Sequence, residues 1–203
     1  MNVEELLKEV ELFLEIEFED DVRQKLADYC GLILEWNQRI NLISRKSEYE
    51  VLKTGLIESF SLVEILEYCG GEDMIDIGSG GGIPGMIAAI MLPDSNFLLV
   101  DSVGKKINVL DDISRRLNLQ NVEVRKARLE EISKEYEGKF DTLFTRGVGD
   151  HDKLMSHFKK VINDYGTILI LSGEDKIKDK VYEDADFNEN PYLDGRVIIT
   201  IEK

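Results

Sequence analysis

Apolar side chains recur at helical spacing through the first 70 residues of the chain. Leu6 and Val10 are four positions apart, as are Val22 and Leu26, and Tyr29 follows three positions later. Apolar residues at this spacing form the buried stripe of an amphipathic helix. The pattern predicts helices over residues 3–14, 21–39 and 47–68.

From residue 74 onward, short apolar runs alternate with amphipathic stretches. The runs predict strands near 74–78, 96–101, 121–125, 141–145 and 166–171, and the stretches predict helices near 84–92, 105–118, 128–135, 152–162 and 174–182. Such alternation is typical of right-handed crossovers and a parallel sheet covered on both faces. The tail differs, because residues 185–190, a turn through 191–195 and a strong strand over 196–202 predict an antiparallel hairpin at one edge.

The expected fold class is therefore α/β, a doubly wound, mostly parallel seven-stranded sheet with an N-terminal helical extension. The segment CGGED at residues 69–73 reads as a hinge between two parts. We expect residues 1–70 to form the helical extension and residues 71–203 to form a ligand-binding domain.

The stretch MIDIGSGGGIPG, Met74–Gly85, predicts a strand, a tight turn and the start of a helix. Glycines in such a turn permit positive φ and let a ligand approach the backbone. Two ligand classes use turns of this kind. The spacing from Gly80 through Gly82 to Gly85 matches the dinucleotide fingerprint GxGxxG, whereas Asp76-x-Gly78-x-Gly80-x-Gly82 is typical of S-adenosylmethionine (SAM) methyltransferases.

Two carboxylates bear on this choice. Asp76 lies inside an apolar strand, where a buried carboxylate needs a partner, and the ammonium or water network of an aminoacyl ligand would supply one. Both ligand classes expect a carboxylate at the end of the second strand to bind ribose hydroxyls, and FLLVD supplies it at Asp101. Asp76 and the predicted hairpin at the C-terminal end favour SAM over a nicotinamide cofactor as the ligand.

Composition restricts the remaining classes of function. The chain has two cysteines and two histidines, which argues against a disulfide framework and against a Cys/His zinc site. No apolar run reaches the length of a membrane span, and we expect a cytoplasmic protein. The net charge of −16 opposes nucleic-acid binding. Residues 101–160, however, hold 13 basic and 11 acidic side chains, which permits a local basic face.

Several segments together resemble one family, the RsmG (GidB) methyltransferases. They are LILEWNQRINLIS at 32–44, the glycine turn ending in GIPG, LVDSVGKKINVL at 99–110, ARLEE at 127–131, TRGV at 145–148 and LDGRVIITIEK at 193–203. The resemblance covers nearly the whole chain. It implies a Rossmann-like methyltransferase fold and methyl transfer from SAM to guanine N7 in small-subunit (16S) rRNA. The implied partner is that rRNA or the ribosomal subunit, and we expect a monomer without membrane contact.

The resemblance also implies roles for individual residues. The backbone of the glycine turn would approach the methionine part of SAM, Asp101 would accept hydrogen bonds from the ribose, and Arg146 would lie near SAM and the incoming guanine as the catalytic residue. Leu129 and Glu130 would face the adenine. The predicted cofactor-binding set is Asp76, Gly78, Gly80, Gly82, Ile83, Asp101, Leu129, Glu130 and Arg146, and no metal is expected.

The sequence also departs from the family pattern. A histidine and an aspartate that are common in the third helix are replaced by Gly55 and Glu58, and a lysine after the fifth strand is replaced by Ser172. These changes remove cations that would serve near RNA. Together with the acidic surface, they support the alternative hypothesis of a divergent homologue that binds SAM without methylating RNA. A third hypothesis, an NAD-dependent oxidoreductase, rests on the literal GxGxxG spacing. Lys53 or Lys176 would be the cations that compensate for the missing histidine and lysine.

Overall fold

The computed structural model describes residues 2–69, 71–149, 151–174, 185–188, 193 and 195–203. These residues form a seven-stranded sheet in the order β3-β2-β1-β4-β5-β7-β6. Its strands are β1 (Asp73–Ile77), β2 (Asn96–Asp101), β3 (Val122–Lys126), β4 (Phe140–Arg146), β5 (Ile162–Gly173), β6 (Ala185–Asn188) and β7 (Arg196–Glu202). Strands β1 to β5 pair in parallel, whereas β7 runs antiparallel to both β5 and β6. The predicted sheet with its reversed last strand is confirmed.

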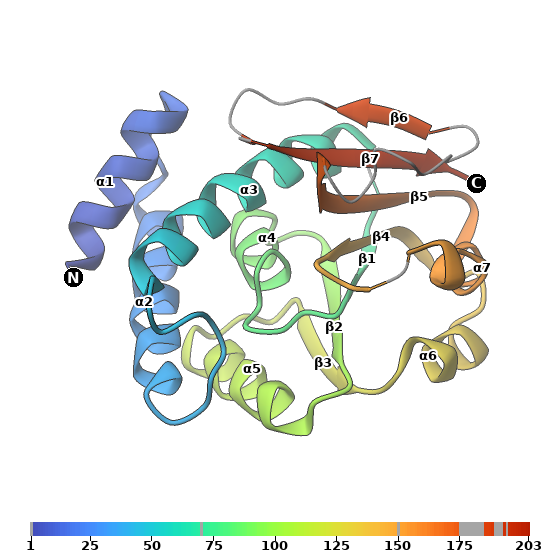
Figure 1. Ribbon diagram of the computed structural model, residues 1–203, viewed down its shortest axis with the longest axis horizontal. Coiled ribbons are helices and arrows are strands. Elements are labelled where there is room, and N and C mark those ends of the chain that lie inside the picture. Colours follow the sequence, from blue (N-terminus) through green and yellow to red (C-terminus); the bar gives the residue numbers. More distant parts are fainter. Residues whose placement is uncertain (1, 70, 150, 175–184, 189–192, 194) are drawn as a thin grey trace.

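The helices cover both faces of the sheet (Figure 1). Their bounds are α1 (Val3–Leu14), α2 (Asp20–Asn37), α3 (Glu48–Cys69), α4 (Gly85–Met91), α5 (Gly104–Arg116), α6 (Leu129–Glu135) and α7 (His151–Val161). Helices α3, α4 and α5 lie against one face with α1 and α2 outside them, and α6 and α7 cover the other face. The helix predicted over 174–182 falls almost entirely outside the described residues.

Strand β1 shows why the central strands read as apolar runs. Met74 packs into the layer of α3, α4 and α5, and Ile75 and Ile77 pack into the layer of α6 and α7. A strand of a parallel sheet buries both of its faces, so apolar side chains at successive positions are required. Asp76 shares its face with Met74 and is fully buried. It is therefore a polar exception in an apolar strand, and its burial has to be explained by its surroundings.

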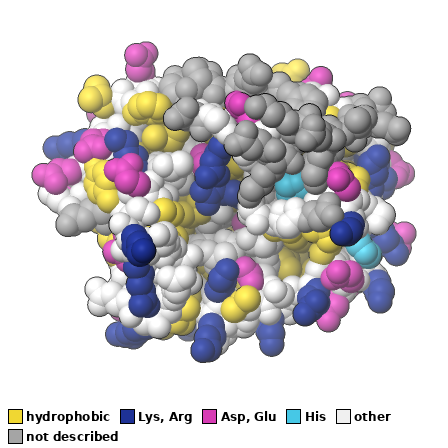
Figure 2. Space-filling model, viewed as in Figure 1, with side chains coloured by type: hydrophobic (Ala, Val, Ile, Leu, Met, Phe, Trp, Pro, Cys, Tyr) yellow, Lys and Arg dark blue, Asp and Glu magenta, His cyan; other side chains and the backbone are white. Residues whose placement is uncertain are grey.

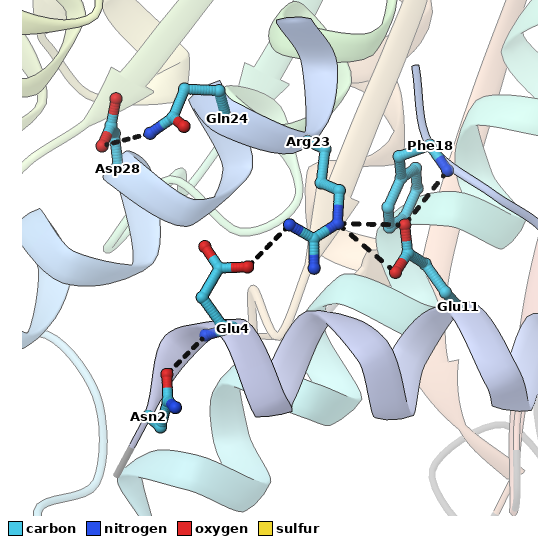
Figure 3. Close-up of polar contacts among 7 residues, drawn as sticks. All are labelled: Asn2, Glu4, Glu11, Phe18, Arg23, Gln24 and Asp28. Carbon is cyan, nitrogen blue, oxygen red and sulfur yellow. Dashed lines mark hydrogen bonds and ion pairs between the residues drawn. The ribbon is translucent and has the colours of Figure 1, made fainter. Parts of the chain in front are cut away.

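The N-terminal helices share one core with the sheet. Leu6 and Leu26 belong to the same buried cluster as Met86 on α4 and Leu99 on β2. Figure 3 shows the polar contacts on the outside of this packing. Arg23 on α2 lies between two carboxylates of α1, with its Nη1 2.6 Å from Glu4 Oε2 and its Nε 3.3 Å from Glu11 Oε1. These ion pairs hold α1 against α2, away from the sheet.

Element boundaries differ from the predicted ones by a few residues. Strand β5 is longer than predicted, because its pairing with β4 continues past an irregularity to Ile162. The other described boundaries fall within about the usual two residues of the predicted positions. No helix in the described part of the chain is long and apolar enough to cross a membrane.

Candidate cofactor and methyl-transfer site

The glycine turn follows β1 directly and is anchored on the neighbouring strand. The backbone N–H groups of Gly78 and Ser79 both donate to the carbonyl of Val100, at 2.8 and 3.0 Å. Gly78 and Gly82 have φ values of +82° and +90°, which other residues rarely adopt. A Cβ on Gly78 would collide with Val148 Cγ2, and a Cβ on Gly82 would lie 2.5 Å from Met86 Cγ. Glycine is therefore required here by both conformation and space.

Gly85 has a packing role in the same turn. It is the first residue of α4, and a Cβ at this position would collide with Asp76 Oδ2 and lie 2.5 Å from Leu99 Cδ2. Its lack of a side chain lets the helix start press against β1 and β2. The third glycine of the GxGxxG spacing is thus explained by helix–sheet contact, which is the same in both ligand classes.

Asp76 is a buried carboxylate under the turn. Its side chain is fully buried, and neither oxygen has a hydrogen-bond partner of good geometry among the described residues. Burial raises the pKa of Asp76 to about 7, while the nearby Ser79 side chain and Gly85 backbone oppose the shift more weakly. A buried carboxylate without a partner is costly unless it stays protonated or meets a cationic group.

Asp101 ends β2 and orders the turn from the other side. Its Oδ2 accepts a hydrogen bond from the Gly80 N–H at 3.0 Å, and its Oδ1 accepts one from the Val103 N–H at 2.8 Å. Lys106 Nζ lies 3.7 Å from Oδ2. A carboxylate has about four lone-pair positions, so both oxygens retain acceptor capacity toward a ligand.

A cavity of about 470 Å³ opens beside these residues. This volume lies in the range of small-molecule sites. Its lining residues come from the ends of β1 and β2, the turn, the starts of α5, α6 and α7 and the segment after β4. They are Ile77, Gly78, Val100, Asp101, Ser102, Val103, Lys106, Ala127, Arg128, Leu129, Glu130, Gly147, Val148 and Leu154. Sequence reasoning missed Lys106, Val148 and Leu154 as lining residues, although the first two stand inside segments that carry the resemblance.

Some of the other predicted site residues line the cavity and some do not. Leu129 is buried and Glu130 is exposed, and both line the cavity. The first turn of α6 is capped by the neighbouring carboxylate, because Glu131 accepts a 2.8 Å hydrogen bond from the Arg128 N–H. Glu130 is therefore not needed as the cap. The other members of the predicted set are not among the lining residues, and they are Asp76, Gly80, Gly82, Ile83 and Arg146. Ile83 packs toward α3.

Arg146 ends β4 on the side of the sheet that faces α3. Its Nε lies 2.6 Å from Oε2 of Glu58, a carboxylate that is 1% exposed. Arg196, at the start of β7, places its Nε 2.8 Å from Oε1 of the same carboxylate. These contacts are ion pairs, since the geometry of neither meets that of an aligned hydrogen bond. Gly147 and Val148, which follow Arg146, line the cavity.

Helix α2 and the loop after it cover the glycine turn. The hydroxyl of buried Tyr29 donates to the Gly81 carbonyl at 2.9 Å. Asn37 organises the loop, because its Oδ1 accepts from the N–H groups of Leu42 and Ile43 at 2.7 and 3.0 Å. Leu42 Cβ and Ile43 Cγ2 would each lie 3.7 Å from a Cβ on Gly81. The family-like segment at 32–44 thus packs over the turn.

The structure shows the surroundings of the positions that depart from the family pattern and of the proposed compensating lysines. A Cβ on Gly55 would lie 3.0 Å from two carbons of Ile83, so a larger residue in α3 would press on the turn. Lys53 is engaged elsewhere, with its Nζ 2.7 Å from Glu9 Oε2, and Lys176 lies outside the described residues. Ser172 is buried near the end of β5. Within the described ranges, no group of three or more His, Cys, Asp or Glu side chains is placed to hold a metal ion.

Comparison with known proteins agrees with this geometry. The family model GidB, described as rRNA small subunit methyltransferase G, matches residues 22–191. A ribosomal RNA small subunit methyltransferase G of Chlorobium chlorochromatii is 36% identical over 171 residues, which cover 84% of this chain and 70% of that protein. The protein of the same name from Christiangramia forsetii is 33% identical and covers 89% of this chain and 90% of its own.

Solved structures share the fold at low sequence identity. A methyltransferase from Geobacter sulfurreducens matches with a TM-score of 0.65 and 12% identity over 96% of both chains. M. jannaschii TYW2 in complex with AdoMet matches with a TM-score of 0.54 and 14% identity over 73% of this chain and 74% of its own. These similarities establish the architecture and leave substrate choice to the site.

Proposed function

Because the chain belongs to the GidB family of small-subunit rRNA methyltransferases, we propose that it transfers the methyl group of SAM to N7 of a guanine in 16S rRNA. The observation that carries the proposal is the joining of three parts at one edge of the sheet. They are the positive-φ glycine turn, the carboxylate of Asp101 beside a cavity, and the charged group of Arg146 at the end of β4.

The residues around the cavity fit SAM. The Asp101 oxygens that remain able to accept hydrogen bonds suit ribose hydroxyls, and buried Leu129 offers an apolar surface for a base. Asp76 lies beneath the turn with no hydrogen-bond partner of good geometry among the described residues. A cationic amino group at the turn would compensate its charge. Glu130 is placed at the rim, where it can meet the polar edge of an adenine.

The chemistry places modest demands on the protein. SAM supplies an electrophilic methyl group on a sulfonium, and guanine N7 has a lone pair and no proton. A general base is therefore unnecessary, and the work of the chain is to align the reactants and exclude water. The packing of α2 and its loop over Gly81 restricts the turn, and Arg146 stands where it can orient the incoming base.

A basic surface for RNA is available despite the overall charge. Figure 2 shows Lys and Arg side chains along the lower rim of the viewed face, over α5 and α6. Lys106 and Arg128 are among the residues that line the cavity on this side. Cations that contact phosphates release counterions, which provides affinity at moderate salt.

Two measurements test the proposal. Calorimetric titration should show SAM binding to the wild-type protein and much weaker binding to Asp101→Asn, which keeps the shape of the side chain but removes its charge. Tritiated methyl transfer to small ribosomal subunits lacking the modification should then label guanine N7. Absence of SAM binding by the wild-type protein would refute the assignment of the turn.

The divergent-homologue hypothesis remains the second candidate. It is favoured by Gly55 and Ser172 at two positions where the family commonly has cations, and by the net charge of −16. It predicts SAM binding by calorimetry with no methyl transfer to either naked 16S rRNA or the assembled subunit. A methyl group located at guanine N7 would exclude it.

We further propose that the two parts of the chain have different roles. Residues 1–70 would serve as a helical cover for the site, and residues 71–203 would bind SAM. The shared core and the Tyr29–Gly81 hydrogen bond support a cover that is part of one folded unit. The proposed working form is a cytoplasmic monomer, and light scattering of the purified protein tests the monomer.

A further inference from the structure

We infer that Glu58 is a positioning residue that holds Arg146 and Arg196 as a paired receptor for an RNA phosphate beside the target guanine. The inference rests on the proposed function and deepens it. Glu58 comes from α3, Arg146 from the end of β4 and Arg196 from the start of β7. The two ion pairs of one carboxylate thus join the N-terminal helices to two separate strands of the sheet.

Burial shows that the carboxylate is directed inward, to the arginines. Glu58 is 1% exposed, whereas the side chains of Arg146 and Arg196 are 21% and 37% exposed. Glu58 therefore cannot itself meet a ligand in solvent, but the partly exposed side chains of Arg146 and Arg196 can.

Among the described residues, the contacts with Glu58 use the Nε of each arginine and not its terminal nitrogens. Each arginine approaches Glu58 through its Nε, and among the described residues none accepts a hydrogen bond from the terminal nitrogens of either arginine. A guanidinium presents its donors as a rigid planar fork that matches phosphate oxygens. The two guanidinium groups and the carboxylate that fixes them carry a net charge of +1 together. This charge suits a phosphodiester, which carries one negative charge.

The position of the pair makes RNA the appropriate ligand. Arg146 is followed by Gly147 and Val148, which line the cavity next to the glycine turn. A nucleotide whose base reaches that turn would bring its own backbone past the end of β4. Arg196 lies opposite Gly173 at the end of β5, so it extends the cationic surface two strands farther along the same edge, from β4 to β7.

The test separates positioning from simple structural support. Glu58→Gln keeps the size of the side chain and removes the charge that fixes both arginines. We expect kcat for methyl transfer to fall about 100-fold, the loss that follows a misplacement of about 1 Å, with SAM affinity by calorimetry near the wild-type value. Glu58→Asp, which restores the charge, should recover part of kcat.

Arg196→Gln isolates the phosphate contact. Binding of a fluorescent 16S rRNA fragment should weaken, and the slope of log affinity against log salt should become shallower by about 0.7, the value for one single-strand phosphate contact. KM for RNA should rise while kcat changes little. If Glu58 acts on RNA binding through both arginines, Glu58→Gln should weaken binding less in the Arg196→Gln background than in the wild-type protein.

Glu11→Gln is the matched control. Glu11 also pairs with an arginine across two helices, but in the α1–α2 contact of Figure 3, so its loss should reduce stability and leave kcat, KM and the salt slope unchanged. The inference is overturned if Glu58→Gln behaves like Glu11→Gln, or if Arg196→Gln keeps the wild-type salt slope. If Glu58→Gln fails to fold, the salt dependence of RNA binding by Arg196→Gln decides whether the inference stands.

The outcomes also distinguish this inference from the function on which it rests. If wild-type protein binds SAM but labels no rRNA, the proposed function fails. RNA binding by the same protein still tests the receptor, because the salt slopes require no turnover. If methyl transfer proceeds and the slopes of wild type and Arg196→Gln coincide, the function stands and the receptor is refuted.

Discussion

The hydroxyl of Tyr29 in α2 donates a 2.9 Å hydrogen bond to the carbonyl of Gly81, 52 positions later in the chain. Both groups are buried, and burial raises the pKa of the Tyr29 phenol well above its usual value. The phenol therefore keeps its proton at neutral pH and remains a donor. This bond ties the N-terminal helices to the turn at which we place the methionine part of SAM.

Tyr29→Phe should loosen the glycine turn without changing its sequence. The buried carbonyl of Gly81 would lose its donor, which costs about 1–3 kcal/mol of folding free energy. SAM affinity should fall because part of the binding energy would then order the turn. Chemical denaturation and calorimetry measure the two effects. Tyr165→Phe is the control, since that side chain is 96% exposed, and equal effects of both substitutions would contradict the proposed link.

Gly85→Ala should show how closely α4 packs on the sheet. The added methyl group would meet Asp76 Oδ2 and Leu99 Cδ2, and relieving such a contact costs about 1–3 kcal/mol of stability. Gly31→Ala on α2 is the matched control, because no atom of the described residues outside the local backbone of the helix lies within 4 Å of its Cβ position. That change should stabilise the protein by about 0.5–1 kcal/mol. The free energy of unfolding in urea measures both, and a neutral Gly85→Ala would refute the packing role.

Asp76 should make the apo protein less stable as pH rises. Its folded pKa of about 7 lies above the unfolded value, so between about pH 4 and pH 7 the folded state binds more protons at this site. Stability from this group is thus full below pH 4 and declines toward pH 7, by up to about 4 kcal/mol. The unfolding free energy of Asp76→Asn minus that of wild type should therefore increase over this range. A difference that stays constant with pH would show that Asp76 is not protonated in the fold.

The sequence was most informative where a pattern is local. The order of helices and strands followed from apolar periodicity, and the turn with Asp101 followed from spacing, because successive parallel strands bring their carboxyl ends to one edge. Glu58 was noted only as a departure from a family pattern. Its pairing with Arg146 and Arg196 depends on how α3 crosses two strands. Likewise, no local signal in residues 21–39 indicates that Tyr29 reaches Gly81.

Arg146 should be needed for turnover more than for SAM binding. Arg146→Ala removes the guanidinium at the end of β4 and should abolish most methyl transfer, with kcat reduced about 100-fold if orientation of the base is its role. Because buried Glu58 would keep Arg196 but lose its ion pair with Arg146, the variant should also lose stability. Single-turnover transfer to small subunits should therefore be measured well below the midpoint of thermal unfolding.

Two further variants complete this test. Arg146→Lys keeps a positive charge beside Glu58 but lacks the planar fork, so it should fold normally and transfer methyl groups slowly. Arg23→Ala removes an arginine that lies between Glu4 and Glu11 in α1, and it should lose stability while keeping wild-type kcat. Unchanged turnover in Arg146→Ala would remove this residue from the mechanism. Full activity in Arg146→Lys would reduce its role to that of a positive charge that balances Glu58.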